Sequence, residues 1–136
     1  MCIRDSFDVE VIHGDALRDA DDVMAYFSGL ATVQGIGSNR YRPGAVADHL
    51  TSLGGKLLGS GQMSALRWLE AGATGSYGTV VEPCNFPAKF PDPALLLTYY
   101  LRGDTLIESY WRSVAMPGQG VFIGEPLARP WPSPVE

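Results

Sequence analysis

Three side chains in this sequence have the chemistry of a nucleophilic site: those of Cys84, His49 and Asp48. A cysteine nucleophile needs a base to form its thiolate, and this base often needs a carboxylate to orient it. Cys84 follows a predicted strand, and His13 is a second candidate base. The opposing interpretation is that Cys84 is a small buried apolar residue. Asp48 and His49 are also adjacent, and adjacent residues of a strand face opposite sides of a sheet.

Glu82 and Glu125 are carboxylates that each precede a proline where a predicted strand ends. If the two strand ends are neighbours, these carboxylates could serve as general acid and general base. Residues in such turns more often cap a helix or anchor a loop through hydrogen bonds to the backbone. Glu82 and Asn85 also lie close to Cys84 in the sequence, so they are the candidates for supporting a cysteine hydrolase.

The sequence predicts neither a metal site nor a bound cofactor. Zinc sites use three or four His, Cys or carboxylate ligands, and no pair among His13, His49 and Cys84 has the spacing of such ligands. The glycine pairs at 35–37 and 72–75 complete no phosphate-binding fingerprint. Any chemistry in this chain therefore depends on its own side chains.

The composition limits the class of protein and its partners. The chain has 136 residues, of which 46% are hydrophobic and 18% charged, and its formal net charge is −5. This length fits one domain with a hydrophobic core. Because Lys and Arg form no basic cluster, we expect no nucleic-acid partner. The partner is otherwise open, and a protein or peptide is one candidate. The longest aliphatic run is Ala94 to Leu97, so no segment is predicted to span a membrane.

Hydrophobic periodicity predicts strands and helices that alternate along most of the chain. Apolar runs predict strands at residues 7–12, 23–27, 73–81 and 121–123, and a weaker element, strand or short helix, at 45–50. Helical spacing and capping residues predict helices at 62–71, 93–102 and about 105–114. This order indicates a three-layer α/β fold, with a mostly parallel sheet flanked by helices.

Several boundaries of these elements are predicted from single residues. The glycines and proline of residues 34–44 indicate a loop. Ser60 and Gly72 are the expected caps of the first helix. Asp92 before Pro93 is the expected N-cap of the second helix, and Asp104 or Thr105 is the expected N-cap of the third. The third helix should bury one stripe of residues: Leu106, Ile107, Tyr110, Trp111 and Val114.

The loops after the predicted strands are the expected place for a ligand, because open α/β sheets bind ligands beyond the carboxyl ends of their strands. Here those ends are expected near His13, Ser28, Glu82 and Glu125. The loops at 28–44 and 82–92 would then carry recognition. The residues that we expect to bind a ligand are Ser28, Tyr77, Asn85 and Glu125.

Four segments of the chain resemble an uncharacterised bacterial family: residues 43–55, 62–91, 100–111 and 120–130. This family is known mainly from genomes that carry exosortase-type protein-sorting systems, and its members are longer and exported. The resemblance implies that this chain is the C-terminal part of such a protein of the cell envelope. Residues 1–6 look like a spurious start that recurs in gene predictions from metagenomic assemblies, which leaves one partial domain at 7–136.

A more distant resemblance is to the caspase-like fold of gingipain-type cysteine peptidases. Residues 25–30 look like the strand that leads to the catalytic His of that family, but Leu30 stands at the His position. Residues 49–54 look like the strand that leads to the catalytic Cys, but Thr51 or Ser52 stands there. Residues 124–126 look like the closing turn of that fold.

This second resemblance implies a caspase-like domain that has lost the peptidase dyad and is not an enzyme, since leucine can neither accept a proton nor orient a base. Such a domain would act in binding or in surface assembly. The alternative is a cysteine hydrolase or peptidase that uses Cys84 with His49 or His13.

Overall fold

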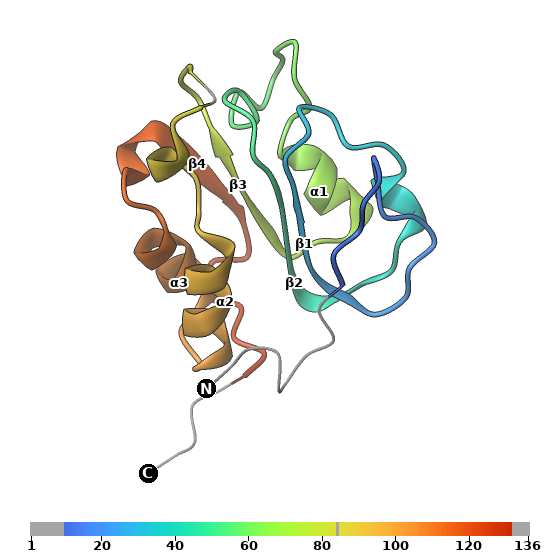
Figure 1. The fold of residues 1–136 in the computed structure, drawn as a ribbon. Coiled ribbons are helices and arrows are strands. Elements are labelled where there is room, and N and C mark those ends of the chain that lie inside the picture. Colours follow the sequence, from blue (N-terminus) through green and yellow to red (C-terminus); the bar gives the residue numbers. More distant parts are fainter. Residues whose placement is uncertain (1–9, 84, 132–136) are drawn as a thin grey trace.

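The computed structural model describes residues 10–83 and 85–131, which form a four-stranded sheet with helices on both faces (Figure 1). The strands are β1 (Val23–Ser28), β2 (Tyr41–His49), β3 (Gly75–Thr79) and β4 (Gly120–Gly124). The α-helices are α1 (Leu66–Ala71), α2 (Pro93–Leu101) and α3 (Leu106–Ser113). The short 3₁₀ helices are η2 (Ile36–Ser38), η3 (Pro87–Lys89) and η4 (Pro117–Gln119).

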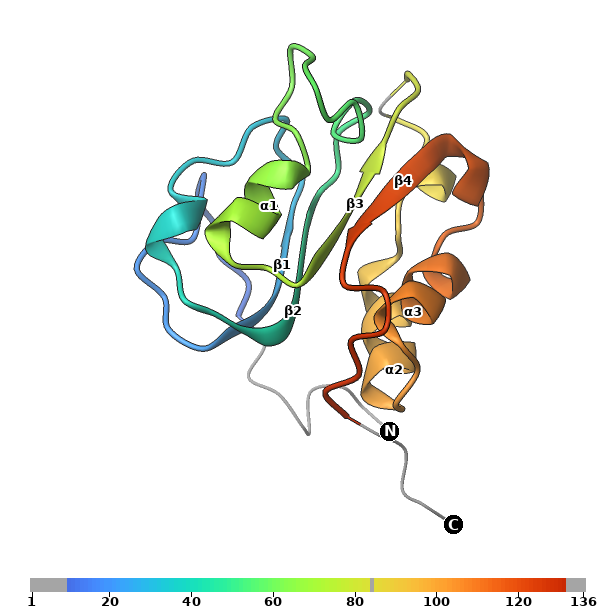
Figure 2. The same ribbon diagram turned by 180° about the vertical axis from the view of Figure 1, so that it is seen from behind.

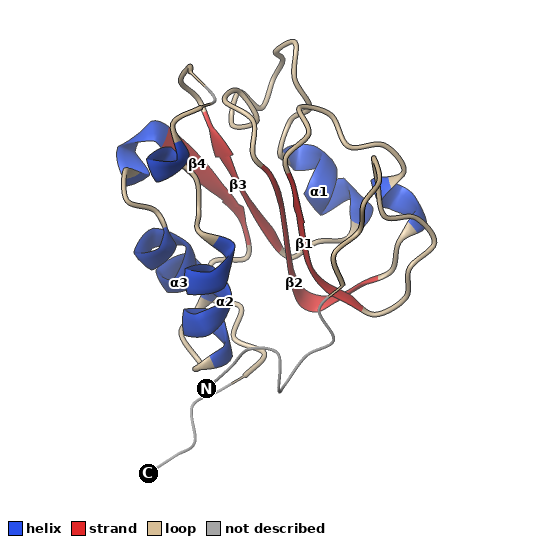
Figure 3. Cartoon of the chain, in the orientation of Figure 1, coloured by secondary structure: helices blue, strands red, loops and turns tan. Residues whose placement is uncertain are grey.

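The sheet has the strand order β1-β2-β3-β4, in which β1, β2 and β3 are parallel and β4 is antiparallel to β3. Helix α1 covers one face, whereas α2 and α3 cover the other, as Figures 1 and 2 show from opposite sides. The predicted α/β fold, with a mostly parallel sheet between flanking helices, is confirmed. Long loops join these elements at the end of the sheet that lies uppermost in Figure 3.

Strand β2 begins earlier than the sequence predicts. We expected a loop at 34–44, but the last four residues of that range belong to β2. The register of the β1–β2 pairing shifts between Val23 and Ala25, which marks a bulge or irregularity in the ladder. Such an irregularity accommodates Pro43, which lacks a backbone donor, and Gly44, whose φ is 91°. Because Pro and Gly usually indicate loops, sequence rules miss this part of the strand.

The first predicted strand is wrong for the part of it that the structure describes. Residues 10–12 belong to no strand, and residues 7–9 lie outside the described residues. The side chain of Val11 is 72% exposed and that of Ile12 is 42% exposed. The alternation of apolar residues there therefore does not correspond to a buried sheet face.

Helix α1 is shorter than predicted, because it begins at Leu66 and not at residue 62. The expected N-cap, Ser60, instead closes a turn, in which its hydroxyl accepts a hydrogen bond from the Gln62 N–H at 3.1 Å. The predicted end of the helix is confirmed, since Gly72 adopts a left-handed conformation with φ 112° and bonds back to the last turn.

The capping residues predicted for α2 and α3 are confirmed. The Asp92 carboxylate accepts a hydrogen bond from the Leu95 N–H at 2.9 Å, and Pro93 occupies the first helical position. Thr105 and Glu108 form a reciprocal capping box at the start of α3. Within residues 10–83 and 85–131, no helix has both the length and the apolar character needed to cross a membrane.

Two hydrophobic clusters hold the three layers together. The larger cluster lies between the sheet and the α2–α3 layer and includes Val46, Tyr77, Leu96, Tyr100, Leu106, Tyr110 and Val114. The smaller cluster lies on the α1 face of the sheet and includes Val33, Ala47, Trp68 and Ala73. Both clusters contain residues of β2, so this strand is buried from both sides.

The buried stripe of α3 is narrower than predicted. Leu106, Tyr110 and Val114 are buried, but Trp111 is 42% exposed. Trp111 lies about 100° around the helix from Tyr110, so it misses the side that faces the sheet. Its ring instead packs edge-on against Tyr77, with the ring centroids 6.3 Å apart.

A close backbone contact joins the loop after β2 to β3. The Gly55 N–H donates to the Thr79 carbonyl at 2.8 Å, and the backbone of Gly55 touches the backbone of Gly78. A Cβ atom at either glycine would overlap the backbone of the other. The loop can therefore lie on the strand only when both positions lack a side chain.

We predict that Gly78→Ala lowers the free energy of unfolding by about 2 kcal/mol or more, because the added methyl group forces the loop away from β3. The matched control is Gly61→Ala, since a Cβ at that position would meet no atom within 4 Å. Urea denaturation of both variants measures the difference. Equal stabilities for the two variants would show that the contact between the two glycines is not tight.

Candidate functional site

The carboxyl ends of β1, β2 and β3 lie together at one end of the sheet, uppermost in Figure 1. Ser28 pairs with His49 in the β1–β2 register, and the Leu50 N–H donates to the Ser28 carbonyl at 2.8 Å. The Thr79 hydroxyl, at the end of β3, donates to the Thr51 carbonyl at 2.8 Å. The sequence analysis places the candidate ligand site at such strand ends.

His49 is the last residue of β2 and is 1% exposed. Its Nδ1 accepts a hydrogen bond from the Trp68 indole N–H at 2.9 Å. Its Nε2 lies 2.7 Å from the Met63 carbonyl oxygen, so this nitrogen carries the proton and donates it. Burial lowers the pKa of His49, which keeps the ring neutral. Because both ring nitrogens are engaged, His49 has no lone pair with which to take a proton from a nucleophile.

Asp48 precedes His49 and is also 1% exposed, but its hydrogen-bond partners lie on β3 and α3. Its Oδ1 accepts hydrogen bonds from the Tyr77 N–H at 2.6 Å and the Ser76 hydroxyl at 3.0 Å, and the Tyr110 hydroxyl lies 3.1 Å from its Oδ2. Burial raises the pKa of Asp48 to about 7, although these donors favour the ionised form. Asp48 does not orient His49, so the two side chains form no base-and-carboxylate pair.

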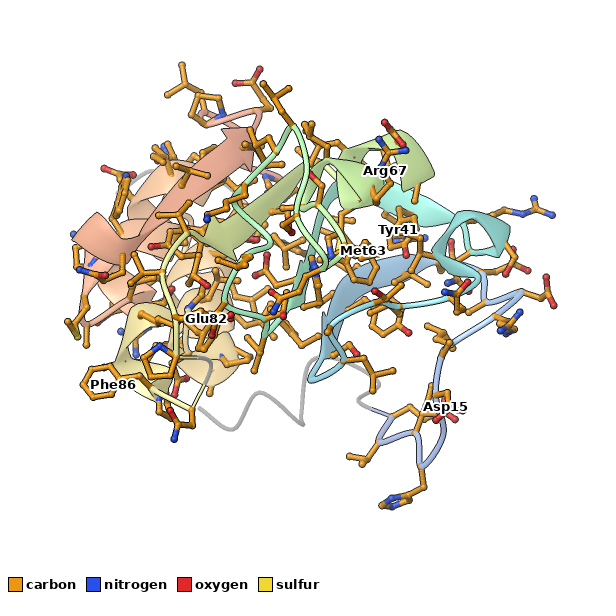
Figure 4. All side chains as sticks on the ribbon, turned by 90° about the horizontal axis from the view of Figure 1, so that it is seen from above. Asp15, Tyr41, Met63, Arg67, Glu82 and Phe86 are labelled. Carbon is orange, nitrogen blue, oxygen red and sulfur yellow. The ribbon has the colours of Figure 1, made fainter. Side chains whose placement is uncertain are left out.

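The remaining members of the predicted hydrolase do not assemble in the part of the chain that the structure describes. Cys84 lies outside the described residues. His13 is exposed and follows no strand, contrary to the expected strand end there. Figure 4, which views the molecule from the loop end, shows Asp15, two residues after His13, on a different side of the molecule from Glu82 and Phe86.

A polar network that the sequence analysis missed fixes the loop after β2. Gln62 Oε1 accepts hydrogen bonds from the Thr51 hydroxyl at 2.6 Å and the Leu53 N–H at 2.7 Å, and Gln62 Nε2 donates to the Ser52 hydroxyl at 3.4 Å. These partners are nine to eleven residues away along an irregular loop. Such a spacing matches no helical or strand period, so no sequence pattern marks Gln62.

The two positions that correspond to the peptidase dyad, by the caspase-like resemblance, lie on neighbouring loops. Leu30 follows β1 and is 39% exposed, whereas Ser52 follows β2 and is fully buried. Thr51, the other residue of the Cys region, is also buried, and its hydroxyl donates to Gln62. Neither position therefore presents a nucleophile or a base to solvent.

Glu82 and Glu125 lie at opposite ends of the sheet, so they do not form the acid–base pair that the sequence analysis weighed against a structural role. Strand β4 is antiparallel to β3, which pairs Thr79 with Gly120 and places the end of β4 beside the start of β3. Glu82 is exposed in the loop after β3. Glu125 instead anchors a turn, since its N–H donates to the Thr74 carbonyl and its carboxylate accepts from the Leu127 N–H at 3.1 Å.

The other residues predicted to bind a ligand have different surroundings. The Ser28 hydroxyl accepts a hydrogen bond from the Leu30 N–H at 3.2 Å and lies at the loop end. Asn85 is exposed in the loop after β3. Tyr77 is 2% exposed, stacks on Tyr110 and donates its hydroxyl to the Pro117 carbonyl at 3.2 Å, so its ring cannot meet a ligand at the surface.

Large apolar side chains are exposed on the loops at this end of the molecule. We call this group the apolar rim; it comprises Leu30, Leu58, Val81, Phe86 and Met116. They come from the loops after β1, β2 and β3 and from the segment before β4. The Met116 N–H donates to the Ala88 carbonyl at 2.8 Å, and the Val80 N–H donates to the Gln119 carbonyl at 3.0 Å, which brings the last of these segments to the same end.

The loop after β3 is held in place by a buried lysine that sequence reasoning also missed. Lys89 is 2% exposed, its ammonium donates to the Val81 carbonyl, and it lies 5.3 Å from the centre of the Phe90 ring. Beside this loop, a hollow of about 350 Å³ is lined by Phe90, Leu95, Val114 and neighbouring residues. The hollow adds apolar surface next to the rim, since Leu95 is 46% exposed.

Among the residues that the structure describes, no three His, Cys, Asp or Glu side chains come together as metal ligands. Comparison of the chain with protein-family models, with curated proteins and with solved structures gave no match. The side chains of the site are therefore the guide to its function.

We predict that His49→Gln leaves the rate of alkylation of Cys84 by iodoacetamide unchanged, because neither nitrogen of His49 can accept a proton from a thiol. The measurement uses a Cys2→Ala background, so that Cys84 is the one remaining cysteine of the sequence. Circular dichroism confirms that the variant is folded. A drop in the rate of tenfold or more would instead identify His49 as the base of a cysteine hydrolase.

Proposed function

We propose that this chain is a non-catalytic α/β domain that binds a protein or peptide through the apolar rim. The observation that carries the proposal is the contrast at the loop end between polar and apolar groups. The polar groups there, such as the buried His49 and the half-buried Gln62, form their hydrogen bonds with neighbouring side chains and with the backbone. The large apolar side chains there are exposed. We infer that these side chains together form an apolar patch, which is the kind of surface that binds other proteins.

A caspase-like relationship without the peptidase dyad is part of this proposal. Three parallel strands followed by an antiparallel one, with helices on both faces, are compatible with such a fold. Leu30 and Ser52 lie on loops that follow neighbouring strands, as the two dyad positions should. Membership of an exported bacterial family associated with protein sorting, and a place in the cell envelope, are proposed from the sequence motifs.

The alternative function, a cysteine hydrolase, lacks a base among the described residues. His49 is buried with both nitrogens engaged. His13 is exposed and lies two residues before Asp15, which is on a different side of the molecule from Glu82 in the loop after β3. A thiol without a base at hydrogen-bond distance is a poor nucleophile near neutral pH. The binding function is therefore the one that the site supports best.

The charges around the rim suggest what kind of segment it binds. Lys56 and Glu82, of opposite sign, are exposed on the loops that carry the rim. These charges do not favour an acidic or a basic ligand. We therefore expect an uncharged, apolar segment, which would bury side chains such as Leu58 and Phe86.

We predict that panning a phage-displayed random 12-residue peptide library on the chain enriches apolar peptides. Leu58→Ser and Phe86→Ser should each weaken the binding of these peptides by about tenfold or more, because burying a large apolar side chain contributes about 1.5–3 kcal/mol. Both side chains are at least half exposed, so the variants should stay folded. Fluorescence polarisation measures the affinities.

The matched control for the rim variants is Leu127→Ser. Leu127 is 71% exposed and follows β4 at the opposite end of the sheet. The Leu127→Ser variant should bind the selected peptides with the same affinity as the unmodified chain. The proposal fails if no peptide is enriched, or if the control weakens binding as much as the rim variants do.

A further inference from the structure

The carboxyl group of Asp48 is enclosed by hydrogen-bond donors from two elements. From β3 it receives the Tyr77 N–H and the Ser76 hydroxyl, both at Oδ1, and from α3 it meets the Tyr110 hydroxyl, which reaches Oδ1 at 3.2 Å and Oδ2 at 3.1 Å. The neighbouring strand β1 places the apolar Phe27 opposite Asp48 in register. The group is fully buried, so water does not solvate its charge.

The titratable groups around Asp48 carry no positive charge that would hold it ionised. They are Tyr77 on β3, Tyr110 on α3, and Tyr100 on α2, which acts on Tyr110. No Lys, Arg or His of the described residues forms an ion pair with Asp48. Burial raises the pKa of each of these tyrosines, so all three keep their protons and remain donors.

The Tyr110 hydroxyl has a second acceptor within reach. The Gly75 carbonyl oxygen lies 3.4 Å from it, besides the two oxygens of Asp48. A phenol has a single proton to donate, so it cannot serve both acceptors at once, but its oxygen can accept one hydrogen bond while it donates another. The choice of acceptor therefore depends on whether Oδ2 of Asp48 carries a proton.

We propose that Asp48 and Tyr110 form a proton-dependent switch, in which the Tyr110 hydroxyl donates to Asp48 on β2 in one protonation state and to the Gly75 carbonyl on β3 in the other. With Asp48 ionised, the Tyr110 O–H donates to the carboxylate on β2. With Asp48 protonated at Oδ2, that O–H donates to the Tyr110 oxygen, and Tyr110 turns its own proton to the Gly75 carbonyl on β3. Both states satisfy these buried groups, so the switch needs no unfolding and no displaced side chain.

The switch operates in the neutral range, because burial raises the pKa of Asp48 to about 7. It acts beneath the exposed Trp111, which follows Tyr110 on α3 and packs against Tyr77. A change in the hydrogen bond of Tyr110 would thus reach the surface of α3. This inference is independent of the peptide-binding function proposed above.

NMR spectroscopy of the uniformly ¹³C- and ¹⁵N-labelled chain tests the switch between pH 4 and pH 9. We expect the Asp48 side-chain carboxyl carbon to titrate with a midpoint near neutral pH, against about 4 for an exposed aspartate. The carbonyl carbon of Gly75 should shift with the same midpoint, because it gains or loses the Tyr110 hydrogen bond. If Asp48 titrates near pH 4, or if the Gly75 signal does not follow it, the switch does not exist.

One variant distinguishes the proposed switch from a buried aspartate that titrates without changing the hydrogen bond of Tyr110. In Tyr110→Phe, Asp48 should still titrate, with a higher midpoint because its carboxylate has lost a donor, while the Gly75 carbonyl should lose its pH dependence. Tyr99→Phe is the matched control on the neighbouring helix and should leave both titrations unchanged. A Gly75 signal that still follows Asp48 in Tyr110→Phe would overturn the assignment of Tyr110 as the switching group.

Discussion

The last two residues of β2 tie both helical layers to the sheet. Asp48 is bonded to α3 and β3 through Tyr110, Ser76 and Tyr77, whereas His49 is bonded to α1 through Trp68. A buried polar group that loses its partner costs on the order of 1–3 kcal/mol. Strand β2 can therefore be buried without that cost only when α1 and α3 are both docked. This constraint makes the formation of the two layers cooperative.

The same constraint limits which side chains at the loop end of the sheet are available to a ligand. Residues with the chemistry of a hydrolase are present at the end of β2, but their hydrogen-bonding capacity is consumed in holding the fold together. The surface that remains available is formed by the apolar side chains of the surrounding loops. The loops keep their shape through contacts of their own, such as the Gln62 network and the backbone contact of Gly55 with Gly78. Loops held by such contacts are consistent with the proposed role of the apolar rim in recognition.

Local features of the sequence predicted much of the fold. The apolar run of β1 and the caps at Asp92 and Thr105 act within one element, so they could be recognised without knowledge of the rest. Features that depend on distant residues were missed. The first part of β2, which includes Pro43, depends on its pairing with β1, and the position of Glu125 depends on the direction of β4. The engagement of His49 depends on Trp68, nineteen residues away, so no spacing rule could show that this histidine is not a base.

The pH dependence of stability tests most directly whether Asp48 and His49 are structural groups. Asp48 has a raised pKa, so the stability that it contributes is present below about pH 4 and is lost as the pH rises to about 7. This loss is on the order of 4 kcal/mol. His49 has a lowered pKa, so its contribution is present above about pH 6.5 and is lost as the pH falls. The measurement is the free energy of unfolding of Asp48→Asn minus that of His49→Gln, from urea denaturation between pH 4 and pH 8, since the contributions of other groups cancel in this difference. We predict that the difference rises with pH across this range, whereas a difference that does not change with pH would contradict the account.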